Sequence, residues 1–214
     1  MAYFASRVKT HWCVEPDELV KHANIICRRA WRALNNWNGP LGTLASEEEK
    51  LLLTHSINPR PLHKCLILRE EILRSPNSPI RDIELLALAF VSVFVASNLK
   101  FGPEVGVSAR RKMDAPVFES WLNKTNEMAF DLRQSASLAA VASRCTCGDA
   151  RQMPADLAPG SVDAVITSPP YPNEKDYTRT TRLESVLLGF IRSKEQLRAF
   201  KQSLIRSNTR NVYR

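Results

Sequence analysis

A short polar stretch near the carboxyl end of the sequence holds the residue types best suited to chemistry, Thr167-Ser168-Pro169-Pro170-Tyr171. Two consecutive prolines fix the backbone φ angle at both positions and remove two backbone donors, so this stretch is stiff. The hydroxyls of Thr167 and Ser168 can donate and accept hydrogen bonds, and the ring of Tyr171 offers a face for stacking. We therefore expect a rigid ligand platform rather than a hinge.

The residues before this platform must position it. An apolar, largely β-branched run precedes it, with Val162, Ala164, Val165 and Ile166, and Pro159-Gly160 supplies a turn signal just ahead of the run. The pattern predicts a short buried strand that ends at the prolines, because proline cannot continue a hydrogen-bonded ladder. The carboxyl end of a strand is where α/β sheets place their ligands.

The stretch from Thr167 to Tyr171 resembles motif IV of the amino-group DNA methyltransferases. These enzymes transfer a methyl group from S-adenosyl-L-methionine to cytosine N4 or adenine N6. The resemblance extends to Gly148-Asp149-Ala150, where the family carries an acidic residue for the cofactor's adenosine, and it continues through 171–179, 183–184 and 187–190. A serine at the first motif position is more frequent in the cytosine-N4 members, so the resemblance implies methylation of cytosine N4.

The resemblance also implies the roles of the catalytic residues Ser168, Pro169, Pro170 and Tyr171. The Ser168 side chain and the Pro169 carbonyl would accept hydrogen bonds from the base amine, which favours pyramidal nitrogen and frees its lone pair for attack on the sulfonium methyl. The target base must leave the duplex to be reached. Tyr171 would then stack on it, with about 1–3 kcal/mol of stabilisation. The plain alternative is a Pro-Pro turn with Tyr171 packed beneath it.

Asp149 and Thr167 are the residues that the resemblance assigns to the cofactor. A carboxylate just past a strand end can accept hydrogen bonds from an adenine amino group or a ribose hydroxyl. The alternative role for Asp149 is a helix N-cap, which aspartate serves well. Both roles can coexist.

The charge of the chain favours a polyanionic partner. The net charge is +8 and the isoelectric point is near 9.5, which steers a protein toward nucleic acid without specifying a sequence. Arg110, Arg111 and Lys112 form a basic cluster that could contact backbone phosphates, although a solvated patch explains it equally well. Tyr177 and Arg179 follow the motif and could border a base pocket, and Arg179 could equally hold a phosphate. DNA is therefore the expected partner.

The composition is that of a globular protein, with 44% hydrophobic and 24% charged residues. The first residues lack the continuous apolar core of a signal peptide, and the strongest apolar run, 85–96, is too short to span a membrane. Five cysteines without framework spacing fit a reducing cytoplasm of the bacterial or archaeal type. Their spacing lacks the two-residue gap of structural zinc sites, so we expect no metal.

Helices dominate the predicted secondary structure. Amphipathic spacing and capping signals predict helices at 15–37, 46–53, 62–73, 79–99, 114–142, 151–157, 180–190 and from 194 onward. Strands are predicted at 144–147 and 162–166, and 101–113 is predicted to be a loop. The expected fold class is α/β, a partial Rossmann-like methyltransferase domain that is mostly helical in this chain and has about two parallel strands.

One part of the family pattern is missing. The methyltransferases carry a Phe-x-Gly-x-Gly loop that wraps the methionine end of the cofactor, and this sequence has none. Two strands do not make an independently stable sheet. We therefore expect residues 1–142 to be a helical insertion or companion and residues 143–214 to be a partial Rossmann-like catalytic core. The chain is then an internal piece of a methyltransferase, or one half of a split enzyme whose second chain supplies the loop.

The expected function is site-specific DNA methylation, of the kind found in restriction-modification systems, with weak or absent cofactor binding by the isolated chain. Two alternatives stay open. One is a non-catalytic nucleic-acid-binding remnant that keeps the motif. The other is a methyltransferase that acts on RNA bases or protein glutamine amides, since related Pro-Pro-Tyr elbows serve those enzymes. The sequence carries no readable code for the target DNA site.

Overall fold

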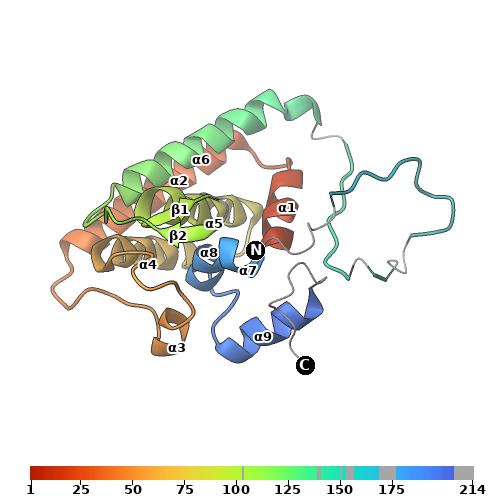
Figure 1. Ribbon diagram of the computed structural model, residues 1–214. Coiled ribbons are helices and arrows are strands. Elements are labelled where there is room, and N and C mark those ends of the chain that lie inside the picture. Colours follow the sequence, from red (N-terminus) through yellow and green to blue (C-terminus); the bar gives the residue numbers. More distant parts are fainter. Residues whose placement is uncertain (103, 139–140, 150, 153–156, 169–176, 205–214) are drawn as a thin grey trace.

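The structure is a computed structural model that describes residues 1–102, 104–138, 141–149, 151–152, 157–168 and 177–204. It is mostly helical, as the sequence predicts (Figure 1). The helices are α1 (Ala2–Thr10), α2 (Pro16–Asn35), α3 (Ser46–Glu49), α4 (Pro59–Leu73), α5 (Pro79–Val91), α6 (Val117–Gln134), α7 (Tyr177–Thr180), α8 (Arg182–Leu187) and α9 (Lys194–Ser203). A π-helical turn, η1 (Ser92–Ala96), extends α5, and a 3₁₀ turn, η2 (Ala136–Leu138), follows α6. None of the described helices is both long and apolar enough to cross a membrane.

Local chemistry explains where several helices begin. Proline stands in the first turn of α2, α4 and α5, where its missing N–H costs no hydrogen bond. Ser78 caps α5 by accepting a hydrogen bond from the Arg81 backbone N–H at 3.2 Å. Ser193 caps α9 in the same way, accepting from the Gln196 N–H at 3.3 Å. Both starts lie within a residue of the predicted positions.

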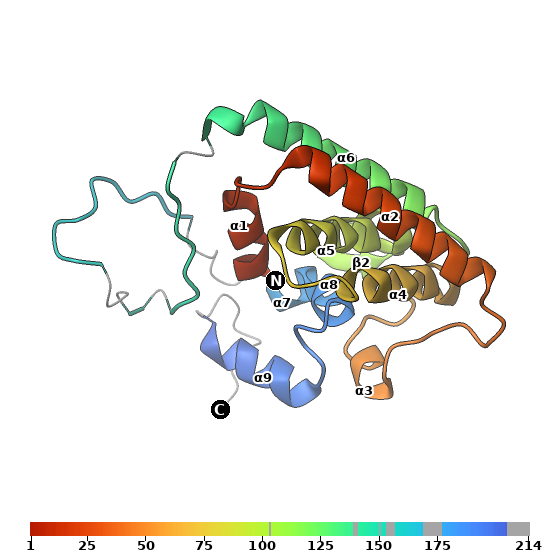
Figure 2. The ribbon, with the colours of Figure 1, turned by 180° about the vertical axis from the view of Figure 1, so that it is seen from behind.

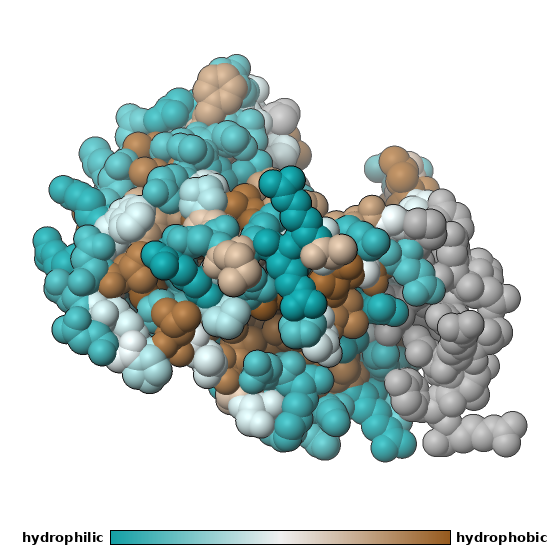
Figure 3. All heavy atoms as spheres, turned by 60° about the vertical axis from the view of Figure 1, so that its left-hand side comes forward, coloured by the Kyte–Doolittle hydropathy of each residue, from teal (hydrophilic) through white to brown (hydrophobic). Residues whose placement is uncertain are grey.

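The core is formed where α2, α4 and α6 surround α5 (Figures 1 and 2). Fully buried apolar side chains come from each of these helices, among them Ile26, Leu68, Leu88 and Trp121. Val186 and Leu187 of α8 belong to the same cluster. Helix α8 therefore packs into one core with the helices that precede residue 142, although it lies in the predicted second domain. On the face shown in Figure 3, hydrophobic residues form patches between hydrophilic ones.

The strands differ from the prediction. Strands β1 (Leu99–Phe101) and β2 (Val105–Val107) form an antiparallel hairpin at the start of the segment predicted to be a loop. The predicted strands at 144–147 and 162–166 are irregular. A strand needs a neighbour to pair its backbone groups, and no strand lies beside these segments in the described part of the chain. Residues 157–168 instead extend away from the helices (Figure 1), whereas Ser143 and Cys145 contact the backbone of α1.

The predicted helix at 114–142 is also shorter than expected. Helix α6 begins at Val117 and ends at Gln134. Asp114, the first residue of the predicted range, lies before the helix, and its carboxylate Oδ1 accepts hydrogen bonds from Lys64 Nζ at 2.6 Å and the Ala115 N–H at 2.7 Å. The predicted helix at 151–157 is not seen in its described residues, since 151–152 form a turn.

A buried carboxylate, Glu84, connects the central helix to its neighbours. Its Oε1 lies 2.7 Å from His22 Nδ1 on α2, and His22 Nε2 lies 3.1 Å from Ser75 Oγ beyond α4. Its backbone oxygen accepts a hydrogen bond from Trp121 Nε1 on α6 at 2.9 Å. The Glu84 side chain is completely buried, and this burial raises the pKa of its carboxyl group.

The order of serine, histidine and glutamate in this network resembles that of a hydrolase triad. However, Ser75 is only 9% exposed, so its hydroxyl is poorly placed to meet a substrate. Among the described residues the structure has an apolar groove of about 800 Å³ between α1 and α6, and Ser75 does not line it. We therefore assign the network to stability rather than to nucleophilic catalysis.

Replacing His22 with alanine is expected to destabilise the protein by about 1–3 kcal/mol, because Glu84 then stays buried without its donor. The measurement is urea unfolding followed by circular dichroism. His11→Ala, at an exposed histidine after α1, is the control and should change the free energy of unfolding by less than about 0.5 kcal/mol. Equal effects of the two substitutions would contradict the structural role of the network.

Candidate functional site

The predicted catalytic motif lies partly inside the described residues. Thr167 and Ser168 are exposed and irregular. Pro169, Pro170 and Tyr171 lie outside the described residues, and their predicted roles stay predictions. Just before the motif, Ile166 is 99% exposed. The described half of the motif is therefore open to solvent rather than set at the end of a sheet.

Asp149, the predicted cofactor residue, is held by Arg151. The Arg151 guanidinium donates to both carboxylate oxygens, with Nε 2.9 Å from Oδ1 and Nη2 2.6 Å from Oδ2. The Arg151 backbone N–H also donates to Oδ1 at 3.0 Å. The side-chain hydrogen bonds with Arg151 are the main cause that lowers the pKa of Asp149 to about 2. Asp149 is thus an ionised acceptor, and a ligand hydroxyl must share or displace Arg151 to reach it.

The basic cluster is divided between surface and structure. Arg110, Arg111 and Lys112 are all exposed residues. Lys112 also has a structural contact, because its ammonium group donates to the carbonyl of Phe94 at 3.3 Å and that of Val95 at 2.8 Å at the end of η1. Burial lowers the pKa of Lys112. Lysine at such a position satisfies the orphan carbonyls of a helix end, so Arg110 and Arg111 are the better placed of the three to meet phosphate.

Tyr177 and Arg179 lie on α7, which packs beside α8. Tyr177 is 42% exposed. Arg179 Nη1 lies 3.6 Å from Glu104 Oε2, just before β2. This contact links α7 to the hairpin rather than to the motif. The two residues therefore lie at the surface of the helical body, and residues 169–176 separate them from Ser168 in the sequence.

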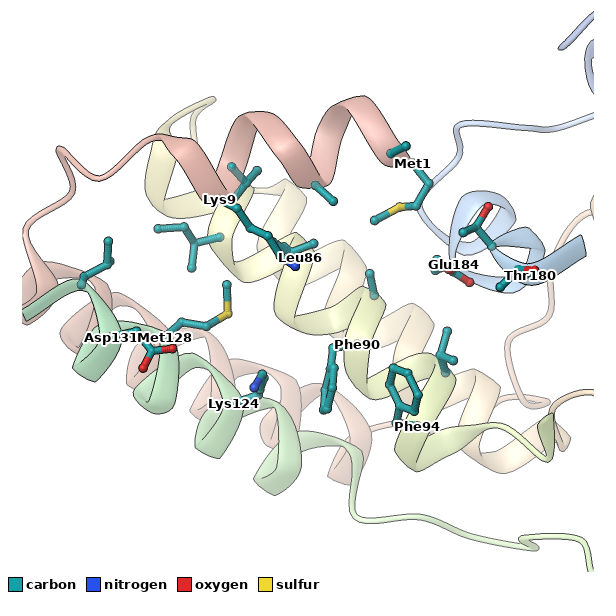
Figure 4. A pocket seen from close by; sticks show the side chains of 18 of the residues that line it. Met1, Lys9, Leu86, Phe90, Phe94, Lys124, Met128, Asp131, Thr180 and Glu184 are labelled. Carbon is teal, nitrogen blue, oxygen red and sulfur yellow. The ribbon is translucent and has the colours of Figure 1, made fainter. Parts of the chain in front are cut away.

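The structure also contains a groove that the sequence did not predict. It has a volume of about 800 Å³ and lies over α5, between α1 and α6 (Figure 4). Its lining is mainly apolar and includes Leu86 and Phe90 of α5, Phe94 of η1 and Met128 of α6. The sequence carries a signal for it, since residues 86, 90 and 94 follow a four-residue step on one helix face.

Glu184 of α8 closes one part of this groove, close to Thr180 (Figure 4). The residue is 8% exposed. Burial raises the pKa of the Glu184 carboxyl group to about 7, while the nearby amino group of Met1 acts in the opposite direction. Among the described residues, no hydrogen-bond partner reaches Glu184 Oε2. The groove therefore combines an apolar lining with one unsatisfied acceptor.

Neither metal ligands nor known relatives assign a role to these residues. Within the described ranges no group of three histidine, cysteine, aspartate or glutamate side chains could hold a metal ion, and none of the five cysteines, all of which are described, forms a disulfide bond. Comparisons of the chain with protein-family models, curated proteins and solved structures found no match. Function must therefore be argued from the chain's own residues.

The buried Glu184 should make stability depend on pH. Its pKa is about 7 in the folded protein against an ordinary value of 4.5, so the folded state binds the extra proton between these values. The stabilisation that Glu184 contributes is fully present below pH 4.5, and it is lost as the pH rises through about 7. Between these two pH values, the free energy of unfolding of the wild type should fall by on the order of 2–3 kcal/mol relative to that of Glu184→Gln.

Urea unfolding at a series of pH values measures this difference. Glu119→Gln, at an exposed carboxyl group of α6, is the matched control and should keep the wild-type pH dependence. Stability curves of wild type and Glu184→Gln that run parallel from pH 4 to pH 8 would show that the Glu184 carboxyl group is not perturbed by burial.

Removing the Arg151 guanidinium should release Asp149. In Arg151→Ala the pKa of Asp149 should rise from about 2 toward its ordinary value of 3.8, because both side-chain hydrogen bonds are lost. A carboxyl-carbon NMR titration measures this pKa directly. Arg110→Ala, at an exposed arginine in a separate loop, should leave it unchanged. An Asp149 pKa that is the same in all three proteins would mean that the ion pair does not persist in solution.

Proposed function

We propose that this chain carries the base-amine-binding motif of an amino-group DNA methyltransferase that uses S-adenosyl-L-methionine and acts on cytosine N4. The observation that carries the proposal is the sequence Thr167-Ser168-Pro169-Pro170-Tyr171 directly after the apolar run 162–166. A hydroxyl, two prolines and an aromatic ring at this spacing suit a flipped base that must be held by its amine and stacked.

The exposure of the apolar run supports a sheet that another polypeptide segment completes. Val162, Val165 and Ile166 are 51, 82 and 99% exposed. Burying a side chain such as Ile166 would contribute about 1.5–3 kcal/mol, and β-branched residues suit a strand. We propose that this run becomes a parallel strand of a Rossmann-like core when the segment with the Phe-x-Gly-x-Gly loop is supplied.

The site residues then divide the work. The Ser168 side chain and the Pro169 carbonyl accept hydrogen bonds from the base amine and free its lone pair, and the cofactor supplies the electrophilic methyl group. Tyr171 stacks on the flipped base. The ionised Asp149 carboxylate suits the hydroxyl or amino donors of an adenosine, with Arg151 moving aside. Thr167 contacts the cofactor, Pro170 keeps the motif rigid and Tyr177 borders the base pocket, while the net charge of +8 favours approach to DNA.

Methyl transfer is the decisive test. The chain, alone and together with the products of neighbouring reading frames, is incubated with tritiated S-adenosyl-L-methionine and unmethylated DNA. Digestion to nucleosides should then yield N4-methylcytosine. Ser168→Ala should lower the rate by on the order of 10²-fold, as expected when one hydrogen-bonding group of a reacting site is lost. Ser161→Ala, a serine of the same segment outside the motif, should retain the rate.

The product distinguishes the alternatives. N6-methyladenine would keep the enzyme class and change the target base, whereas methylated RNA or methylated glutamine would replace DNA as the substrate. The chain would be a nucleic-acid-binding remnant rather than an enzyme if two results were obtained together. No methylated product would form with any added reading frame, and the affinity for DNA would be unchanged in Tyr171→Ala. Equal rates for wild type and Ser168→Ala would refute the catalytic role of the motif.

A further inference from the structure

The groove over α5 exposes a row of phenylalanine rings. Phe90, Phe94 and Phe101 are 41, 58 and 45% exposed. The ring centroids of Phe90 and Phe94 lie 4.8 Å apart, and those of Phe94 and Phe101 lie 5.7 Å apart. Contiguous exposed apolar groups mark binding surfaces, unlike single exposed residues. The row offers flat faces on which a planar ligand can stack.

Glu184 supplies the polar group that selects among apolar ligands. Its carboxylate lines the groove and is nine-tenths buried, and in the described part of the chain its Oε2 has no partner. A buried acceptor without a donor destabilises the protein. A ligand that donates an N–H group to this oxygen should therefore bind more tightly than a ligand that places only carbon beside it. The Thr180 hydroxyl lies close by (Figure 4) and can serve as donor or acceptor.

Two lysines flank the rings. Lys9 of α1 and Lys124 of α6 both line the groove, and Lys124 Nζ lies 4.6 Å from the Phe90 ring centroid. Lys124 also pairs with Glu127 at 2.8 Å, and Asp131 lines the same side. The chain as a whole is strongly basic. Among the lining side chains, Lys9 and Lys124 are therefore the ones that can meet the phosphate of a ligand that joins an aromatic ring to a phosphate.

We propose that this groove binds an amino-substituted nucleobase, with its ring stacked on Phe94 and its exocyclic amine donating to Glu184 Oε2. A volume of about 800 Å³ is within the range of small-molecule sites. An acyl chain or an apolar helix could fill the groove but would leave Glu184 without a donor. The proposal does not rest on methyl transfer, because Thr167 and Ser168 do not line the groove.

The test compares two ligands that differ by one group. Adenosine 5′-monophosphate carries the exocyclic amine, and purine riboside 5′-monophosphate lacks it. In calorimetric titrations at pH 8, above the pKa of about 7 of Glu184, the first should bind the wild type about 10-fold more tightly, a typical effect of one hydrogen bond to a charged group. In Glu184→Leu the two affinities should become equal. Equal affinities for the wild type, or no saturable binding of either nucleotide, would overturn the proposal.

A second variant keeps the test valid if Glu184→Leu does not fold. Phe94→Ala removes a ring that is 58% exposed, and its matched control, Phe130→Ala, removes a ring of α6 that is 57% exposed and lies outside the groove. Phe94→Ala should weaken both nucleotides about 10-fold through lost stacking, and Phe130→Ala should weaken neither. Equal weakening by the two variants would overturn the assignment of the groove.

Two further titrations identify the source of the base and separate this site from the methyl-transfer motif. A short adenine-rich DNA strand that competes with the nucleotide, and loses affinity in Phe94→Ala, supports the site and assigns it to single-stranded nucleic acid. Nucleotide binding without such competition supports the site for free nucleotides. S-adenosyl-L-methionine binding that is lost in Asp149→Asn and kept in Phe94→Ala belongs to the motif, so either proposal can fail without the other.

Discussion

The buried carboxylate of Glu84 is the constraint around which the helical body is arranged. A carboxylate with no exposed surface requires donors, and His22 of α2 supplies one while Ser75 holds the other side of the imidazole. Trp121 Nε1 of α6 donates a hydrogen bond to the backbone carbonyl of Glu84. These bonds fix how α2 and α6 lie against α5.

Helices were predictable because their information is local. The stripe of α2 repeats at three- and four-residue steps, and Leu19, Ala23, Ile26 and Ala30 are all completely buried. The N-caps at Ser78 and Ser193 were readable for the same reason, since a cap and its partner lie three residues apart. Helix α1 was not among the predicted helices. Its stability depends on packing Phe4 and Val8 against residues such as Ile83, which no local pattern reveals.

The strands and the site depended on contacts that are distant in sequence. Hairpin residues such as Leu99 and Val107 pair only because the chain reverses between them. A β-branched run such as 162–166 carries strand propensity, but propensity cannot supply a ladder partner. The ion pair of Arg151 with Asp149 joins residues that are close in sequence. It could have been inferred from opposite charges two residues apart. The raised pKa of Glu184 could not be inferred from the sequence, because it follows from burial of this side chain against α1 and α5 in the tertiary structure.

The arrangement of the chain lets the predicted motif change its surroundings without disturbing the helical core. The core is closed by α8, with Val186 and Leu187 completely buried, and none of the described residues between 141 and 168 belongs to it. Among these residues, the Ser143 hydroxyl donates to the Thr10 carbonyl at 2.8 Å, and the Cys145 thiol lies 4.0 Å from the Tyr3 carbonyl oxygen. Val165 and Ile166 are 82 and 99% exposed, so a sheet that covered them would gain the free energy of their burial. The proposed completion of the sheet by another segment would supply that burial.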